Sequence, residues 1–171
     1  MIGRAQLSEV EHDEEIRQQL TEQRIGDELA IRLVVDEIDN ACDAKDWEKC
    51  RSFFADEIEV DFTSLAGGEP ARMTADDLIG AWRTNLFAEK ITYHQRGNHR
   101  IEIDGPRATV FSKAYAFNLL ESGDLTGLWE VWGNYTHELK KNGALWECSA
   151  IKLEVVHQRG DERVRSYVPE K

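Results

Sequence analysis

Hydrophobic residues follow a helical period in the first half of the chain. From residue 25 to residue 44 they recur every three or four positions, which places them on one face of a helix. These positions are Leu29, Ala30, Leu33, Val34, Ile38, Ala41 and Cys42. A short second helix is predicted from Asp46 to Phe54, with Asp46 as its N-terminal cap. A third is predicted with Thr74 as its N-terminal cap and with Asp76 and Asp77 in its first turn, where they suit the positive end of the helix dipole. It is expected to bury Leu78, Ile79, Trp82 and Leu86.

The second half of the chain has the period of a β-strand. Apolar and polar residues alternate there, as they do in strands with one buried face. Four strands are predicted, at 91–104, 107–119, 127–140 and 144–157. The turns between them are expected at Gly105-Pro106, at 121–124 and at Lys141-Asn142-Gly143. Ile58, Val60 and Phe62 form an earlier strand, which ends before the break at 65–70.

This order of elements predicts an α+β fold. Successive strands joined by short turns form an antiparallel sheet, and three helices are expected to cover one of its faces. A strongly curved sheet wrapped on helices leaves a cone-shaped cavity between the two layers, and such cavities bind ligands.

One domain is expected, because the chain has 171 residues and shows no internal repeat or linker. It is predicted to occupy residues 25–157. The charged segment 1–24 before it is either a surface helix or partly disordered. The polar tail 158–171 after it is expected to be loose.

Composition narrows the possible partners. The net charge is −12, so nucleic acids and anionic membranes are not expected to bind. Five Trp, six Phe and four Tyr provide enough aromatic side chains for a core and an aromatic cavity. We therefore expect a small hydrophobic molecule as the ligand.

The number and spacing of the cysteines, and the absence of known cofactor-binding motifs, limit which compartment, metal sites and cofactors are expected. Cys42, Cys50 and Cys148 are odd in number and lack metal-site spacing, which favours a reduced, cytoplasmic protein without a metal. The N-terminal residues lack the apolar stretch of a signal peptide, and no 18-residue apolar run occurs. No glycine-rich phosphate-binding motif or serine-hydrolase motif is present, so no cofactor is expected.

Asp43 and His94 are the candidate catalytic residues. Asp43 lies near the end of the first predicted helix, and His94 lies near the start of a predicted strand. A carboxylate that hydrogen-bonds to one imidazole nitrogen fixes the tautomer and makes the other nitrogen a general base. The alternatives are a solvent-exposed or capping aspartate and a purely structural histidine.

Five other residues are candidates for substrate binding. Strand alternation and aromatic character favour Phe62, Trp82, Asn118 and Tyr135 around the cavity. Asn98 shares strand parity with His94, so its amide is a further candidate donor, with Tyr135, to a substrate oxygen. His99 has the opposite parity, so it faces away from the cavity unless a β-bulge intervenes.

Two local patterns carry a family resemblance. One is Asp43-Ala44-Lys45-Asp46-Trp47, followed by Phe53-Phe54-Ala55 and Glu59-Val60-Asp61-Phe62; the other is His94-x-x-x-Asn98, followed by Arg100-Ile101-Glu102-Ile103-Asp104-Gly105. With the order of elements over residues 25–157, these patterns resemble the SnoaL-like branch of the nuclear transport factor 2-like superfamily. The resemblance implies an α+β cone with a deep pocket, and a homodimer.

Within that family, scytalone dehydratase and hexachlorocyclohexane dehydrochlorinase are most similar in these motifs, and both use an Asp–His pair. The chain departs from the dehydratase where that enzyme has two tyrosines and a second histidine: Cys42, Phe62 and Asn118 stand there.

The resemblance implies a cofactor-free lyase or isomerase, dehydratase-like or polyketide-cyclase-like, that acts on a small hydrophobic ring compound. The alternative is a module of the same fold that binds a ligand or assembles without chemistry, including the small subunit of an oxygenase.

Overall fold

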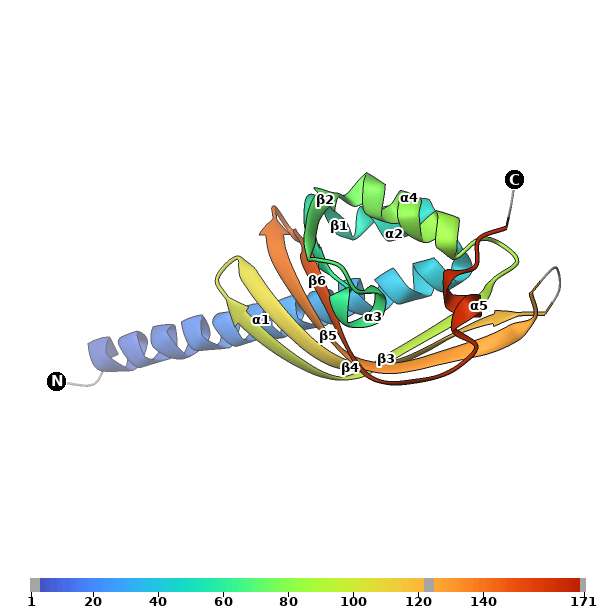
Figure 1. The fold of residues 1–171 in the computed structure, drawn as a ribbon. Coiled ribbons are helices and arrows are strands. Elements are labelled where there is room, and N and C mark those ends of the chain that lie inside the picture. Colours follow the sequence, from blue (N-terminus) through green and yellow to red (C-terminus); the bar gives the residue numbers. More distant parts are fainter. Residues whose placement is uncertain (1–3, 122–124, 170–171) are drawn as a thin grey trace.

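A six-stranded curved sheet with helices along its concave side forms the body of the protein (Figure 1). The computed structural model describes residues 4–121 and 125–169. The strand order is β2-β1-β6-β5-β4-β3. The strands are β1 (Phe54–Asp61), β2 (Ala71–Thr74), β3 (Ile91–Asp104), β4 (Arg107–Leu120), β5 (Gly127–Asn142) and β6 (Leu145–Gly160), and the helices are α1 (Arg4–Ala44), α2 (Trp47–Ser52), α3 (Thr63–Ala66), α4 (Ala75–Asn85) and α5 (Glu162–Ser166).

The predicted α+β architecture is confirmed. The long strands β3 to β6 match the four alternating segments closely, and all three pairs among them are antiparallel. One pair differs from the expected antiparallel sheet, because β1 and β6 run parallel. Short turns force an antiparallel arrangement only on strands that follow each other in the chain. Strands β1 and β6 do not, because β2, β3, β4 and β5 all lie between them in the sequence. The turn expected at 121–124 falls largely on residues 122–124, outside the described part.

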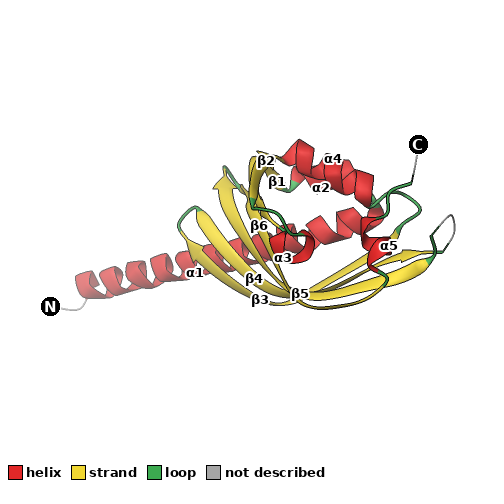
Figure 2. Ribbon diagram, in the orientation of Figure 1, coloured by secondary structure: helices red, strands yellow, loops and turns green. Residues whose placement is uncertain are grey.

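Helix α1 is the longest element, and it extends well beyond the sheet toward the N-terminus (Figures 1 and 2). The described part of segment 1–24 is thus helical. Side chains 14–26 are exposed, and contact with the sheet begins at Asp27, whose Oδ1 accepts hydrogen bonds from Lys141 and Trp146. Past this point Ile31, Val35 and Ile38 are almost completely buried against the concave face.

The two predicted helix caps are confirmed. Asp46 accepts a hydrogen bond from Lys49 N at the start of α2, and Thr74 accepts one from Asp77 N at the start of α4. The second predicted helix ends earlier than expected, because β1 already begins at Phe54.

The C-terminal tail is not loose, contrary to the expectation. Strand β6 continues to Gly160 and α5 follows, capped by Asp161, which accepts a hydrogen bond from Arg163 N at 3.0 Å. Val164 is completely buried in a second core cluster with Leu120, Trp129 and Val131. Val164 and Tyr167 both pack against this cluster and dock the tail, and Arg165 and Ser166 between them close one side of the cavity.

Candidate functional site

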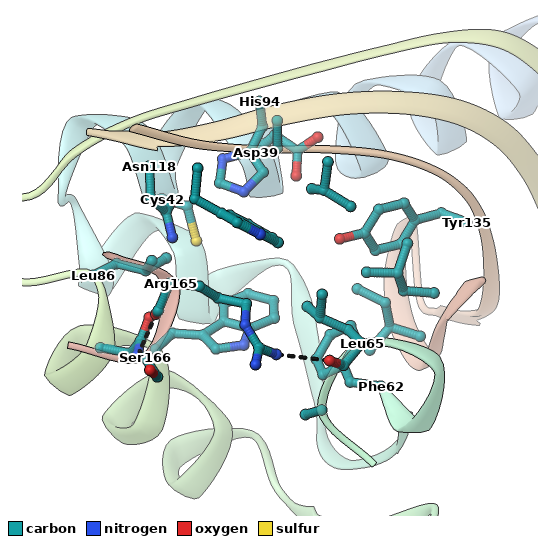
Figure 3. Close-up of a pocket in the computed structure, with 18 of the residues that line it drawn as sticks. Asp39, Cys42, Phe62, Leu65, Leu86, His94, Asn118, Tyr135, Arg165 and Ser166 are labelled. Carbon is teal, nitrogen blue, oxygen red and sulfur yellow. Dashed lines mark hydrogen bonds between the residues drawn. The ribbon is translucent and has the colours of Figure 1, made fainter. Parts of the chain in front are cut away.

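A cavity of about 400 Å³ lies between the concave face of the sheet and the helices (Figure 3). Among the predicted residues, Phe62, Trp82, His94, Asn118 and Tyr135 line it. Most of the remaining wall is apolar and includes Trp129, Val131, Ile151 and Leu153. The size and lining are those of a site for a small hydrophobic molecule.

The structure brings Asp43 and His94 together at this cavity. Oδ1 of Asp43 lies 2.7 Å from Nδ1 of His94, and Oδ2 accepts a hydrogen bond from the His94 backbone N at 2.6 Å. Both side chains are about four-fifths buried. The carboxylate thus fixes the ring and also the strand that carries it.

The end of α1 determines where Asp43 points. Lys45 has φ of +59°, its N donates to Cys42 O, and Asp46 N donates to Ala41 O. This pair of bonds is the Schellman pattern that ends a helix. It holds Asp43 in the last helical turn, facing β3.

Electrostatics in the pair select one tautomer. Burial opposes ionisation of Asp43, but the hydrogen bonds from His94 and Thr92 outweigh it and lower the pKa of Asp43 below its usual value. An ionised carboxylate only accepts hydrogen bonds, so Nδ1 of His94 carries the proton. Nε2 of the neutral ring is then free to accept a proton.

Two residues extend the pair, and sequence reasoning missed both. Thr92 Oγ1 donates to Asp43 Oδ1 at 2.8 Å, and Lys45 Nζ donates to Thr92 Oγ1 at 2.7 Å. Burial lowers the pKa of Lys45, although the charge of Asp43 opposes that change. The alternation of Thr92 and His94 along β3 was the signal that could have identified Thr92.

A buried arginine forms a second polar cluster in the cavity wall. Nε and Nη2 of Arg96 each donate to the carboxylate of Asp39 at 2.5 Å, and the guanidinium lies 4.0 Å from the ring centroid of Tyr135. Burial opposes the charge on Arg96, but Asp39 outweighs it and raises the pKa of Arg96. Asp39 lies one helical turn before Asp43, a spacing that also could have been noticed in the sequence.

His137 completes this cluster in its neutral form. Burial, together with the charge of Arg96, holds the pKa of His137 well below its usual value. Arg96 Nη1 lies 2.9 Å from His137 Nε2, and because arginine only donates, that nitrogen is the acceptor. Burial likewise raises the pKa of Tyr135 to about 12, so its hydroxyl remains a donor.

The prediction for Asn98 is wrong. The register between β3 and β4 shifts between Gly97 and Arg100, and Asn98 is exposed in this bulge with φ of +55°. The same bulge turns His99 inward, where its Nε2 lies 3.0 Å from Asp36 Oδ1. Asparagine adopts positive φ more readily than most residues, so a backbone role displaces the expected substrate contact.

The structure also places the positions that differ from the dehydratase motif. Cys42 and Asn118 line the cavity, and Phe62 stands at its wall just after β1. Asn118 is nearly completely buried, opposite Thr92 in the sheet register. Its amide is therefore placed to meet a ligand near His94.

Two findings concern metals and membranes. Within residues 4–121 and 125–169, the described side chains, which begin at residue 14, include no group of three or more His, Cys, Asp or Glu that could hold a metal ion. None of the helices in these ranges combines the length and hydropathy that a membrane span requires.

Comparison with known families and structures gives consistent results. The family model described as SnoaL-like domain matches residues 23–152. The Kfla4162 protein from Kribbella flavida is 26% identical with a TM-score of 0.74, over 80% of this chain and 95% of that chain. A search of curated proteins gives no match.

Two further solved structures share the fold at lower identity. A putative scytalone dehydratase from Novosphingobium aromaticivorans is 16% identical with a TM-score of 0.69, over 88% of this chain and 93% of that chain. A type 2 hexachlorocyclohexane dehydrochlorinase is 15% identical with a TM-score of 0.68, over 80% and 90% of the two chains.

Proposed function

The chain belongs to the SnoaL-like domain family and has the nuclear transport factor 2-like fold, and from this basis we propose that it is a cofactor-independent lyase or isomerase. Its substrate is a small hydrophobic molecule that contains a ring, and the dehydratase-like and polyketide-cyclase-like reactions of the family are the candidate chemistries. The observation that carries the proposal is the Asp43–His94 hydrogen bond at the edge of an apolar cavity.

The first step is proton removal by His94. Nε2 accepts a proton from a carbon atom next to a carbonyl group, and the electron pair of the broken C–H bond forms an enolate. The ionised carboxylate of Asp43 stabilises the imidazolium that results. Return of the proton to another carbon gives isomerisation, and departure of a leaving group from the neighbouring carbon gives elimination.

The enolate oxygen needs hydrogen-bond donors. The hydroxyl of Tyr135 and the amide of Asn118 both line the cavity, and the high pKa of Tyr135 keeps its proton in place at neutral pH. Donors fixed in an apolar site stabilise a developing negative charge more strongly than water does. These two residues take the role for which Asn98 was considered.

A carbon-acid probe tests the proposal without knowledge of the natural substrate. 2-Tetralone is a bicyclic ketone, and exchange of its α-hydrogens for deuterium in D₂O is followed by NMR. We expect the wild-type protein to accelerate the exchange and His94→Gln to abolish the acceleration. His157→Gln is the matched control, because His157 is exposed, packs against Trp132 and is not among the residues that line the cavity. Equal rates for wild type and His94→Gln would remove the mechanism.

We further propose that the protein is a homodimer joined through the outer face of the sheet. A row of aromatic rings crosses that face, with centroid separations of 5.0–6.4 Å, formed by Tyr93, Phe117, Tyr115 and Trp132. Tyr93 is 46% exposed. The other three rings are partly buried, and a partly exposed aromatic row of this kind suits a protein interface.

Sedimentation velocity tests the dimer. Trp132→Glu places a charge in the row and should convert the dimer to a monomer. Leu145→Glu is the control, because Leu145 is 69% exposed at the β5–β6 hairpin, outside the row. A monomeric wild-type protein would contradict the proposal.

The same fold also supports a second candidate, a module that binds a ligand without chemistry. The cavity supports this candidate as well as it supports the enzyme, and binding of 2-tetralone without exchange would favour it.

We also propose a cytoplasmic location, because all three cysteines are free and buried, which suits a reducing compartment.

A further inference from the structure

Arg165 is a charged residue of the cavity wall that the proton-transfer mechanism does not use. It comes from α5, in the C-terminal segment that docks through Val164. Its backbone carbonyl accepts hydrogen bonds from Asn85 Nδ2 at 3.1 Å and from Lys90 Nζ at 3.3 Å. The backbone at Arg165 is therefore fixed on two sides, and its side chain extends across the cavity edge toward α3 (Figure 3).

The guanidinium of Arg165 is only partly satisfied. Nη1 donates to Leu65 O at 2.6 Å, which is the one hydrogen bond that its guanidinium makes to the described residues. Nε is buried and has no partner among them. Within the described ranges, no carboxylate oxygen comes within ion-pairing distance, 4.0 Å, of its nitrogens. A charged group held beside apolar walls without a counter-charge is costly, and a carboxylate of a ligand would supply that counter-charge.

The other arginine of the cavity shows the contrast. Arg96 is paired through two hydrogen bonds with Asp39, and its third nitrogen meets His137. Its charge is thus balanced within the protein. Arg165 instead has Nη2 without a hydrogen bond to the described residues, and this nitrogen, unlike the buried Nε, keeps accessible surface through which it can donate to a carboxylate.

We propose that Arg165 binds a carboxylate group of the substrate, so that the substrate class of this site is a ring-containing carboxylic acid. This inference rests on the proposed function only in taking the cavity as the substrate site. His94 and Arg165 lie on different sides of the cavity in Figure 3. A carboxylate held at Arg165 therefore directs the opposite end of the ring toward His94 and selects the carbon atom that loses its proton.

Equilibrium binding of two unreactive ligands tests the proposal. Naphthalene-2-carboxylate and naphthalene-2-carboxamide have nearly the same shape, but only the first is charged. Isothermal titration calorimetry at neutral pH should show about tenfold tighter binding of the carboxylate to the wild-type protein, as expected for charge-assisted hydrogen bonds. Arg165→Gln should lose that preference, and Arg165→Lys should keep part of it.

The matched control is Arg163→Gln, on the same short helix. Arg163 points to Asp161 at the surface, and it is not among the residues that line the cavity. This variant should bind both ligands as the wild type does. Thermal unfolding of each variant checks that α5 and the core remain folded, and the wild-type preference provides a readout even if Arg165→Gln does not fold.

Three outcomes would overturn the proposal: equal affinity of the wild-type protein for the two ligands, an unchanged preference in Arg165→Gln, or no carboxylate binding at millimolar concentration. None of them depends on catalysis, because neither ligand reacts. Failure of deuterium exchange with intact carboxylate preference would instead remove the proposed reaction and leave the ligand class in place.

Discussion

Lys90 provides a prediction whose sign and size both follow from the structure. Its side chain is completely buried, and Nζ donates to the carbonyl oxygens of Arg165 and Tyr167 at 3.3 and 2.9 Å. The positive charge of Lys45 acts on Lys90, and the ring centroid of Phe87 lies 5.3 Å from Lys90 Nζ. Burial, with a smaller contribution from the charge of Lys45, lowers the pKa of Lys90 from 10.5 to about 8.

The lowered pKa links stability to pH. The folded protein releases the Lys90 proton at a lower pH than the unfolded chain does, so between about pH 8 and pH 10.5 the unfolded chain binds more protons. The free energy of unfolding therefore gains a contribution as pH rises through this window. With pKa values of 10.5 in the unfolded chain and about 8 in the folded protein, the free energy of unfolding rises by about 2 kcal/mol from about pH 7 to about pH 9.5. This value takes the two hydrogen bonds to the carbonyl oxygens as unchanged.

Urea unfolding of wild type and Lys90→Met at these two pH values isolates the effect. Methionine keeps the unbranched apolar stem but cannot titrate. As the pH rises, the free energy of unfolding of the wild-type protein should increase by about 2 kcal/mol more than that of Lys90→Met, whatever the difference in stability between the two proteins is at pH 7. Lys140→Met, at an exposed position of β5, is the control and should show no such change. A pH-independent difference between wild type and Lys90→Met would refute the reasoning.

Three other substitutions test the site and the fold. Asp43→Asn removes the charge that stabilises the imidazolium of His94, and should lower the rate of 2-tetralone exchange by about a hundredfold at neutral pH, measured by NMR. Tyr135→Phe keeps the ring beside Arg96 but removes the donor hydroxyl, so the same assay should also show about a hundredfold loss, with unfolding by urea little changed. Gly160→Ala forces a methyl group against the Leu128 carbonyl at φ of +97° and should cost at least about 3 kcal/mol of unfolding free energy, against about 1 kcal/mol for the control Gly143→Ala, which has positive φ but open space.

The long elements could be predicted from the sequence, because each repeats its pattern often enough to be recognised. Strand β3 extends over fourteen residues, and β5 and β6 extend over sixteen each. The four-residue strand β2 and the five-residue helix α5 are too short to show a period. Their positions come from contacts with residues that are distant in the chain, and those contacts are not encoded in any local pattern.

The catalytic pair could be identified, whereas much of its surroundings could not. Asp43 and His94 stand in recognisable segments, and helix periodicity places Asp43 near a helix end. The bulge at Gly97–Arg100 is not visible in the alternation, and it exchanges the faces of Asn98 and His99. Arg165 was missed because its segment is mostly polar, and contacts of Val164 and Tyr167 with residues distant in the chain determine where it docks.

The balance of charge in the cavity supports the carboxylate proposal independently of any single contact. Asp39 compensates Arg96, and Asp43 compensates the imidazolium that forms when His94 takes a proton. Arg165 then remains without a counter-charge among the described residues. A neutral substrate would leave the reaction with this unbalanced cation beside apolar walls, whereas a carboxylate neutralises it before the proton moves. A carboxylate bound at Arg165 therefore supplies the counter-charge that Arg165 lacks among the described residues, and the charge that develops on the enolate is left to the donors Tyr135 and Asn118.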